Sequence, residues 1–187
     1  MDNAPTSLCG AVQEATERLK AWFEMTPWDQ GSTSLESINH MTVALAAGFT
    51  AYFAPADVAE RFVIPTDYLC FLQANNGWRE PGDGYGLYMH GTSLVISNTQ
   101  YLCDVMAEMR PATAGMWIEI GHYSDKHDLF LCCDRQLPYI GMVVDGHDDH
   151  PWIPDGYINS WVMEGNPTPY SSFFYASFLQ YLHSIER

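Results

Sequence analysis

The segment from Ile64 to Trp78, IPTDYLCFLQANNGW, constrains the local structure of this chain more tightly than any other stretch. Pro65 suits the first turn of a helix, because the N–H that proline lacks has no partner at that position. An apolar stripe at helical spacing follows, and Gly77 suits the left-handed conformation that ends many helices. The segment therefore predicts a short amphipathic helix with a marked start and end.

Several steps of this segment also form a pattern that resembles the entry segment of the SMI1/KNR4 family, also called the SUKH superfamily. A second match is the run of strands expected from Trp117 to Asp134, which resembles the sheet of that family. The resemblance covers about residues 55–187. The matching steps in the entry segment are Ile64-Pro65, Asp67-Tyr68, Phe71-Leu72 and Asn76-Gly77.

Helical and strand periodicities follow one another in an order that predicts an α+β fold. Apolar stripes at spacings of three and four predict helices over residues 8–23 and 35–49. Thr6 or Ser7 would cap the first helix, and a Thr33–Glu36 capping box would start the second. A short third helix is expected over residues 55–61. After Gly77 the pattern changes to short strands and turns, which predicts a mostly antiparallel sheet of roughly four to six strands.

The expected strands cover residues 86–89, 94–96, 117–120, 129–133 and 139–144. A helix capped by Ser97 or Asn98 and closed by Pro111 separates the second strand from the third. An amphipathic helix from Ser171 to Ile185 should pack on the sheet at the end of the chain. We expect an N-terminal helical segment, residues 1–54, and an α+β domain, residues 55–187, which together form one compact unit.

The net charge limits the class of partner. The chain has 187 residues, with 23 acidic and 8 basic side chains and a formal net charge of −15. Such a surface repels nucleic acid and anionic membranes and attracts basic proteins. No Lys or Arg lies between Gln136 and Glu186, so the acidic excess is unevenly spread. We therefore expect a basic protein partner, and neither nucleic acid nor membrane.

Cysteine usage and hydropathy indicate a cytoplasmic protein. An odd number of cysteines without C-x-x-C spacing suits a reducing compartment, and we expect each of them to be a structural core residue. The N-terminus lacks the basic start and the apolar run of a signal peptide. The longest stretch without charge, residues 37–56, is too polar to span a bilayer. The cysteines are Cys9, Cys70, Cys103, Cys132 and Cys133.

The loop expected after the strand at residues 139–144 contains residue types that bind metals. His147, Asp149 and His150 lie close together in the sequence. No helix holds them on one face and H-E-x-x-H is absent, so a solvated acidic turn is favoured, and we expect no metal and no cofactor. Residues of the preceding strand connection that would lie nearby are His122, His127 and Asp128.

Catalytic motifs are absent from the sequence. There is no G-x-S-x-G, and no cysteine has a recognisable catalytic signature. Pairs of carboxylates follow from the acidic composition and do not indicate acid–base chemistry. We expect no enzymatic activity, and a metal-dependent hydrolase that uses His147, Asp149 and His150 is an alternative.

Aromatic residues flanked by acidic residues mark the expected partner surface. Aromatic anchors inside a charged rim are common at tight protein interfaces, although most large aromatic rings fill cores. Acidic side chains would attract a basic partner, and tryptophan side chains would supply contacts from which water is excluded. The residues expected to bind the partner are Asp145, Asp148, Asp149, Asp155, Trp152, Trp78, Glu80 and Asp83.

The resemblance to the SMI1/KNR4 family implies a binding module. Many bacterial relatives are immunity proteins, which are encoded beside a polymorphic toxin, often a nuclease, and block it. A nuclease must be basic enough to hold phosphate, so an acidic inhibitor can mask its surface. A regulatory scaffold is the alternative, because eukaryotic relatives act in cell-wall signalling through protein contacts. The motif residues that would hold the fold are Tyr68, Leu72, Gly77 and Trp117.

Overall fold

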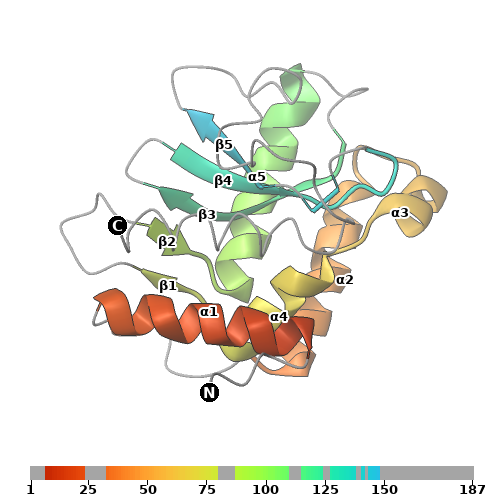
Figure 1. Cartoon of the computed structure of the whole chain (residues 1–187). Coiled ribbons are helices and arrows are strands. Elements are labelled where there is room, and N and C mark those ends of the chain that lie inside the picture. The colour runs from red at the N-terminus through yellow and green to blue at the C-terminus, as the bar shows by residue number, and fades with distance from the viewer. Residues whose placement is uncertain are drawn as a thin grey trace.

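The chain has an α+β fold, as predicted, with helices packed on an antiparallel sheet (Figure 1). The computed structural model describes residues 7–23, 33–79, 87–109, 115–123, 127–137, 140–141 and 143–147. The helix predicted from Ser171 to Ile185 lies outside the described residues.

The helices are α1 (Leu8–Phe23), α2 (Leu35–Phe49), α3 (Pro55–Arg61), α4 (Thr66–Ala74) and α5 (Thr92–Met109). The bounds of the first three agree with the ranges predicted from the sequence. The end of α4 is followed by Gly77 with a φ of 85°, which confirms the predicted left-handed glycine. In the part of the chain that the structure describes, no helix is both long and apolar enough to cross a membrane.

The first residues of α1 and α2 show how the two helices are capped. The hydroxyl of Ser7 accepts the backbone N–H of Gly10 at 3.1 Å, so Ser7 caps α1. Ser34 caps α2 by accepting the N–H of Ser37 at 3.1 Å. The predicted Thr33–Glu36 capping box is therefore wrong. The Thr33 hydroxyl instead donates to the carbonyl oxygen of Asn75 at 3.3 Å, which ties the start of α2 to the end of α4.

The strands are β1 (Trp78–Arg79), β2 (Leu87–Met89), β3 (Trp117–Tyr123), β4 (His127–Cys132) and β5 (Val143–His147). They form one sheet in the order β1-β2-β3-β4-β5, and every neighbouring pair is antiparallel. Figure 1 shows α5 crossing behind the sheet, with α1 and α4 gathered near its β1 end. α5 packs on β3 and on α2, so α2 and α5 form a helical layer on that side.

Three strand predictions need correction. Residues 94–96 lie inside α5, because buried Thr92, Val95 and Thr99 repeat at helical spacing and packing overrides the β-branched composition. The predicted connection at residues 122–128 is shorter, since His122 pairs with Asp128 in the β3–β4 ladder. The loop predicted to begin at residue 145 begins later, because residues 145–147 belong to β5 and pair with β4.

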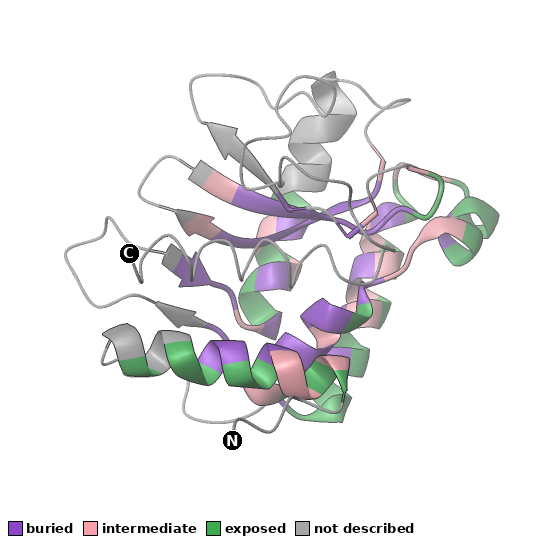
Figure 2. Cartoon of the chain, in the orientation of Figure 1, coloured by how far each residue is buried: buried purple, intermediate pink, exposed green. Residues whose placement is uncertain are grey.

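The core lies between the sheet and the helices, where buried residues line β2, β3 and β4 and the inner sides of α2 and α4 (Figure 2). Two of the residues expected to hold the fold, Tyr68 and Leu72, are fully buried in α4. Trp117 at the start of β3 is also buried, as expected. Among the described residues, the largest fully buried side chains are Trp117, Tyr68, Phe49, Phe71, Met41, Leu72, Met116, Ile118, Ile120 and Leu131.

A disulfide joins α1 to α4, which corrects the interpretation of all the cysteines as core residues that suit a reducing compartment, and Cys9 is exposed. Their Cα atoms are 4.9 Å apart, although 61 positions separate the residues in the sequence. The two cysteines meet because α1 packs along α4. Cys132 and Cys133 are unpaired and buried, as expected of core residues.

An ion pair ties α3 to the segment that follows β4. Arg61 Nε donates to Asp134 Oδ1 at 3.2 Å, and Nη2 of the same guanidinium contacts Oδ2. The backbone reinforces this contact, because the N–H of Arg135 donates to the carbonyl oxygen of Arg61 at 2.9 Å. The Asp134 side chain is completely buried. Asp134, the last residue of the strand run that resembles the SMI1/KNR4 sheet, is therefore paired with Arg61 within the fold.

Candidate functional site

The structure places only part of the predicted partner surface. Trp78 lies in β1 and Asp145 in β5, and their side chains are not described. Because β1 and β5 stand at opposite ends of the strand order, these two residues are not brought together by the sheet. The other predicted partner-binding residues lie outside the described part of the chain: Glu80, Asp83, Asp148, Asp149, Trp152 and Asp155.

The metal hypothesis gains no support from the described residues. His127 and His147 are opposite each other in the β4–β5 ladder, while Asp149 and His150 lie outside the description. Within the described ranges, no group of three or more His, Cys, Asp or Glu side chains is placed to hold an ion.

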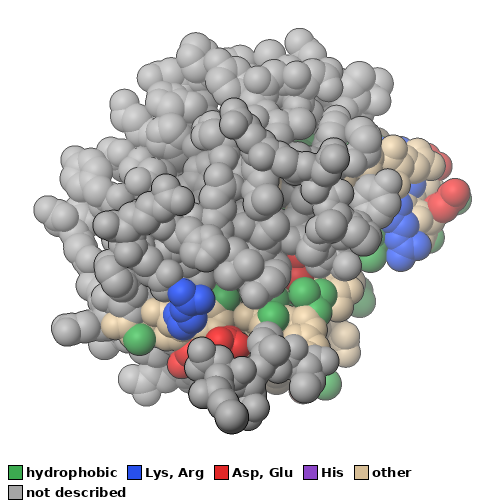
Figure 3. Space-filling model, viewed as in Figure 1, with side chains coloured by type: hydrophobic (Ala, Val, Ile, Leu, Met, Phe, Trp, Pro, Cys, Tyr) green, Lys and Arg blue, Asp and Glu red, His purple; other side chains and the backbone are tan. Residues whose placement is uncertain are grey.

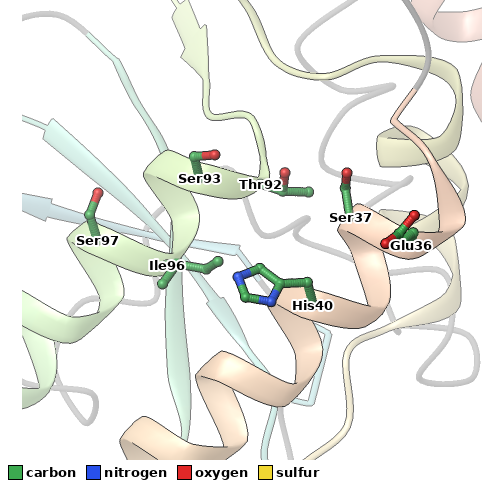
Figure 4. Close-up of a pocket in the computed structure, with 7 residues that line it drawn as sticks. All are labelled: Glu36, Ser37, His40, Thr92, Ser93, Ile96 and Ser97. Carbon is green, nitrogen blue, oxygen red and sulfur yellow. The ribbon is translucent and has the colours of Figure 1, made fainter.

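A surface hollow of about 490 Å³ lies between the first turns of α2 and α5 (Figure 4). The His40 ring extends from α2 toward Ile96 of α5, and Ser37 and Thr92 stand on the two sides of the gap. Four of the seven lining residues carry a hydroxyl group, and the others include one carboxylate and one imidazole. The residues that line the hollow are Glu36, Ser37, His40, Thr92, Ser93, Ile96 and Ser97.

Exposed apolar side chains lie on the helix faces next to this hollow. On α2, Val43 is 69% exposed and shares a face with Glu36 and His40, since these residues are spaced at i, i+4 and i+7. On α5, Leu94 and Tyr101 share a face with Ser97 at i, i+3 and i+7, and Tyr101 is 71% exposed. We call the part of the exposed outer surface of these two helices that includes Val43, Leu94 and Tyr101 the α2–α5 face.

The α2–α5 face differs in charge from α1 and α3. No Lys or Arg occurs at residues 33–60 or 80–109, so neither α2 nor α5 contains a basic residue. α1 and α3, in contrast, contain both acidic and basic residues. Figure 3 shows the opposite side of the molecule, where Lys or Arg side chains lie close to Asp or Glu side chains along α1 and α3.

A second cluster is buried between α5 and strands β2 and β3. His90 is only 2% exposed, and its Nε2 lies 3.4 Å from Nδ1 of His122. Its Nδ1 lies 3.6 Å from Oε1 of Glu119. Asn98 of α5 joins the two groups, because its Nδ2 donates to Glu119 Oε1 at 2.7 Å and lies 3.4 Å from His90 Nδ1. Tyr88 stacks on the His122 ring with centroids 4.4 Å apart.

A β-bulge explains how Glu119 and His122 reach the same cluster. Residues three apart on a regular strand point to opposite faces. The β3–β4 register shifts between Glu119 and Gly121, and this extra residue brings the two side chains to the same side. Gly121 is required here because a Cβ would overlap the carbonyl oxygen of Tyr88 on β2. The close approach of β2 and β3 therefore depends on this glycine.

Burial determines the protonation of the cluster. It raises the pKa of Glu119 to about 7, with a further increase from the charge of Asp128, while the hydrogen bond from Asn98 acts in the opposite direction. Burial lowers the pKa of His90 to about 4, and the neighbouring His122 adds to this shift. Burial also lowers the pKa of His122. Near pH 6 the contact between His90 and Glu119 is therefore one between neutral groups.

Sequence reasoning identified His122 but missed His90, Asn98 and Glu119. His90 follows a short strand and Asn98 was expected to cap a helix, so neither position suggested a buried contact. The available signal was Gly121, because a glycine inside a strand often marks a bulge or a close approach of backbones.

Comparison with known proteins supplies no family. The chain matches none of the family models, and it resembles none of the curated proteins closely enough to count as a relative. The resemblance to the SMI1/KNR4 family therefore depends on the sequence steps quoted above, and function has to be argued from the surface and the charge of this chain.

Proposed function

We propose that this chain is a non-enzymatic protein-binding module that neutralises a basic bacterial toxin, as the resemblance to immunity proteins implies. The observation that carries the proposal is the α2–α5 face. It exposes Tyr101, Val43 and Leu94 on two helices that contain no Lys or Arg and that border a hollow with four hydroxyl-bearing residues. A large exposed aromatic ring beside hydrogen-bonding groups is typical of residues that anchor protein partners.

Charge supports a basic partner. A chain with a net charge of −15 attracts cationic proteins over a distance of about one Debye length, roughly 8–10 Å at physiological salt. The acidic residues predicted from the sequence, such as Asp145 and Asp155, would contribute to this attraction. The α2–α5 face would then supply the contacts from which water is excluded. A nuclease toxin fits this chemistry because its own substrate is anionic.

We propose the cytoplasm as the compartment, as predicted from cysteine usage and hydropathy. Glutathione keeps most cytoplasmic thiols reduced, so the disulfide between Cys9 and Cys70 would be open to reduction there. The disulfide joins α1 to α4, so the bond itself lies outside the α2–α5 face.

Co-expression with the product of the adjacent gene tests the proposal. If that product is the cognate toxin, its expression alone should stop growth, and co-expression of this chain should restore growth and yield a complex that co-purifies. Inhibition of growth that is the same with and without this chain would remove the immunity assignment. An adjacent product that binds this chain without being toxic would favour a regulatory scaffold.

A further inference from the structure

We propose that Glu119, His90 and His122 form one proton-sharing chain, through which the loss of a proton from the buried carboxyl group changes Nε2 of His122 from a hydrogen-bond donor to an acceptor. The inference goes beyond the proposed function and does not depend on it. It concerns a pH-sensitive device inside the fold, and it can be measured on the protein alone.

The order of the groups carries the inference. The side chains lie in sequence from the carboxyl group of Glu119, through both nitrogens of the His90 ring, to Nδ1 of His122. His90 is almost fully buried and His122 is half-buried, so this row of three side chains leads from the interior toward the surface. The contact of 3.6 Å between Glu119 and His90 becomes a hydrogen bond when a small side-chain rotation shortens it by about half an ångström.

The protons of this chain can be counted in two states. In the first, the Glu119 carboxyl donates to Nδ1 of His90, Nε2–H of His90 donates to Nδ1 of His122, and His122 carries its proton on Nε2. In the second, His90 and His122 each carry their proton on Nδ1 and donate toward the Glu119 carboxylate. The second state holds one proton fewer, and the proton that is lost leaves from Nε2 of His122. Each neutral imidazole keeps one N–H throughout.

The environment of the three side chains places the loss of this proton near neutral pH. Burial raises the pKa of Glu119 to about 7, while both imidazoles stay neutral because burial lowers the pKa of each. The other described titratable groups that face the chain are Tyr88 of β2, which stacks on His122, and Asp128 of β4, which pairs with His122 in the ladder. Described α5 residues in contact with Glu119 and His90 are neutral, because they are Asn98 and Thr99.

Long-range ¹H–¹⁵N correlation spectra of the histidine rings test the chain, because they distinguish the Nδ1–H from the Nε2–H tautomer. Between pH 6 and 8.5, His122 of the wild-type protein should change from Nε2–H to Nδ1–H. The midpoint should equal the midpoint of the carboxyl carbon signal of Glu119. A His122 ring that keeps one tautomer over this range, or two midpoints that differ by more than about half a pH unit, would overturn the proposal.

A matched pair of variants shows whether the tautomer change of His122 follows the ionisation of Glu119 or that of another group. In Glu119→Gln the side chain keeps its shape but cannot ionise, so His122 should keep one tautomer throughout the range. Glu14→Gln removes an exposed carboxylate on α1, and His122 should change as in the wild-type protein. A tautomer change that persists in Glu119→Gln would contradict the proposal.

Discussion

Gly121→Ala should lower the free energy of unfolding by roughly 3 kcal/mol or more. The added Cβ overlaps the carbonyl oxygen of Tyr88 and lies 3.1 Å from Cα of Met89, both on β2. Backbone atoms in a paired strand cannot rotate away, so β2 has to separate from β3. That movement strains the hydrogen bond from the N–H of His90 to the carbonyl oxygen of Ile120, now 2.8 Å long. Urea denaturation followed by tryptophan fluorescence measures the loss.

Gly48→Ala is the matched control for this substitution. Its Cβ would meet only the side-chain end of Gln100, with the nearest atom at 3.0 Å, and that flexible end can move. Alanine also has a higher helix propensity than glycine by up to about 1 kcal/mol. We expect the stability of this variant to equal or slightly exceed that of the wild-type protein. Equal losses at both positions would show that the bulge does not hold β2 against β3.

Arg61→Met should cost about 3–5 kcal/mol of unfolding free energy, because it leaves a buried charge without its ionic partner. The Asp134 carboxylate is fully buried, and would retain the N–H of Gln136 at 3.0 Å as a hydrogen-bond donor. Methionine preserves most of the apolar stem of arginine, so the loss reports mainly on the charge. Thermal and chemical unfolding of the purified variant measure this effect.

Two further variants identify the charge as the cause. Adding Asp134→Asn to Arg61→Met removes the unpaired charge, so the double variant should be more stable than Arg61→Met alone. Arg135→Met removes an exposed neighbouring arginine and should change stability by less than about 0.5 kcal/mol. A loss at Arg61 that is no larger than the loss at Arg135 would show that the ion pair contributes little.

Local sequence signals were sufficient for most of the helices. The bounds of α1 and α2 follow from apolar spacing, the start of α3 was indicated by Pro55 and Asp57, and the glycine after α4 was identified by its position. The start of α5 could not be read correctly, because Val95 and Ile96 favour strands in isolation. Only their packing against β3 and α2 fixes them in a helix, and that packing is a tertiary property.

The parts of the candidate sites that could not be predicted from the sequence depend on contacts between residues far apart in the chain. The disulfide requires Cys9 and Cys70 to meet across two helices, and spacing alone does not reveal such a pairing. The buried cluster requires a bulge that reverses the alternation of β3 before Glu119 and His122 can share one side. The α2–α5 face requires the relative rotation of two helices, so the exposure of Tyr101 was not visible in the pattern of residues.

The central claim is that this protein acts by binding a basic partner through the α2–α5 face. The most direct test is the dissociation constant of the purified adjacent-gene product for the wild-type protein, Tyr101→Ser and Leu35→Ser. Leu35 is 65% exposed, but it shares its helix face with buried Ile38, so it is a matched control outside the α2–α5 face. We expect Tyr101→Ser to weaken binding by at least about tenfold and Leu35→Ser to leave it unchanged. Wild-type affinity in Tyr101→Ser would contradict the account.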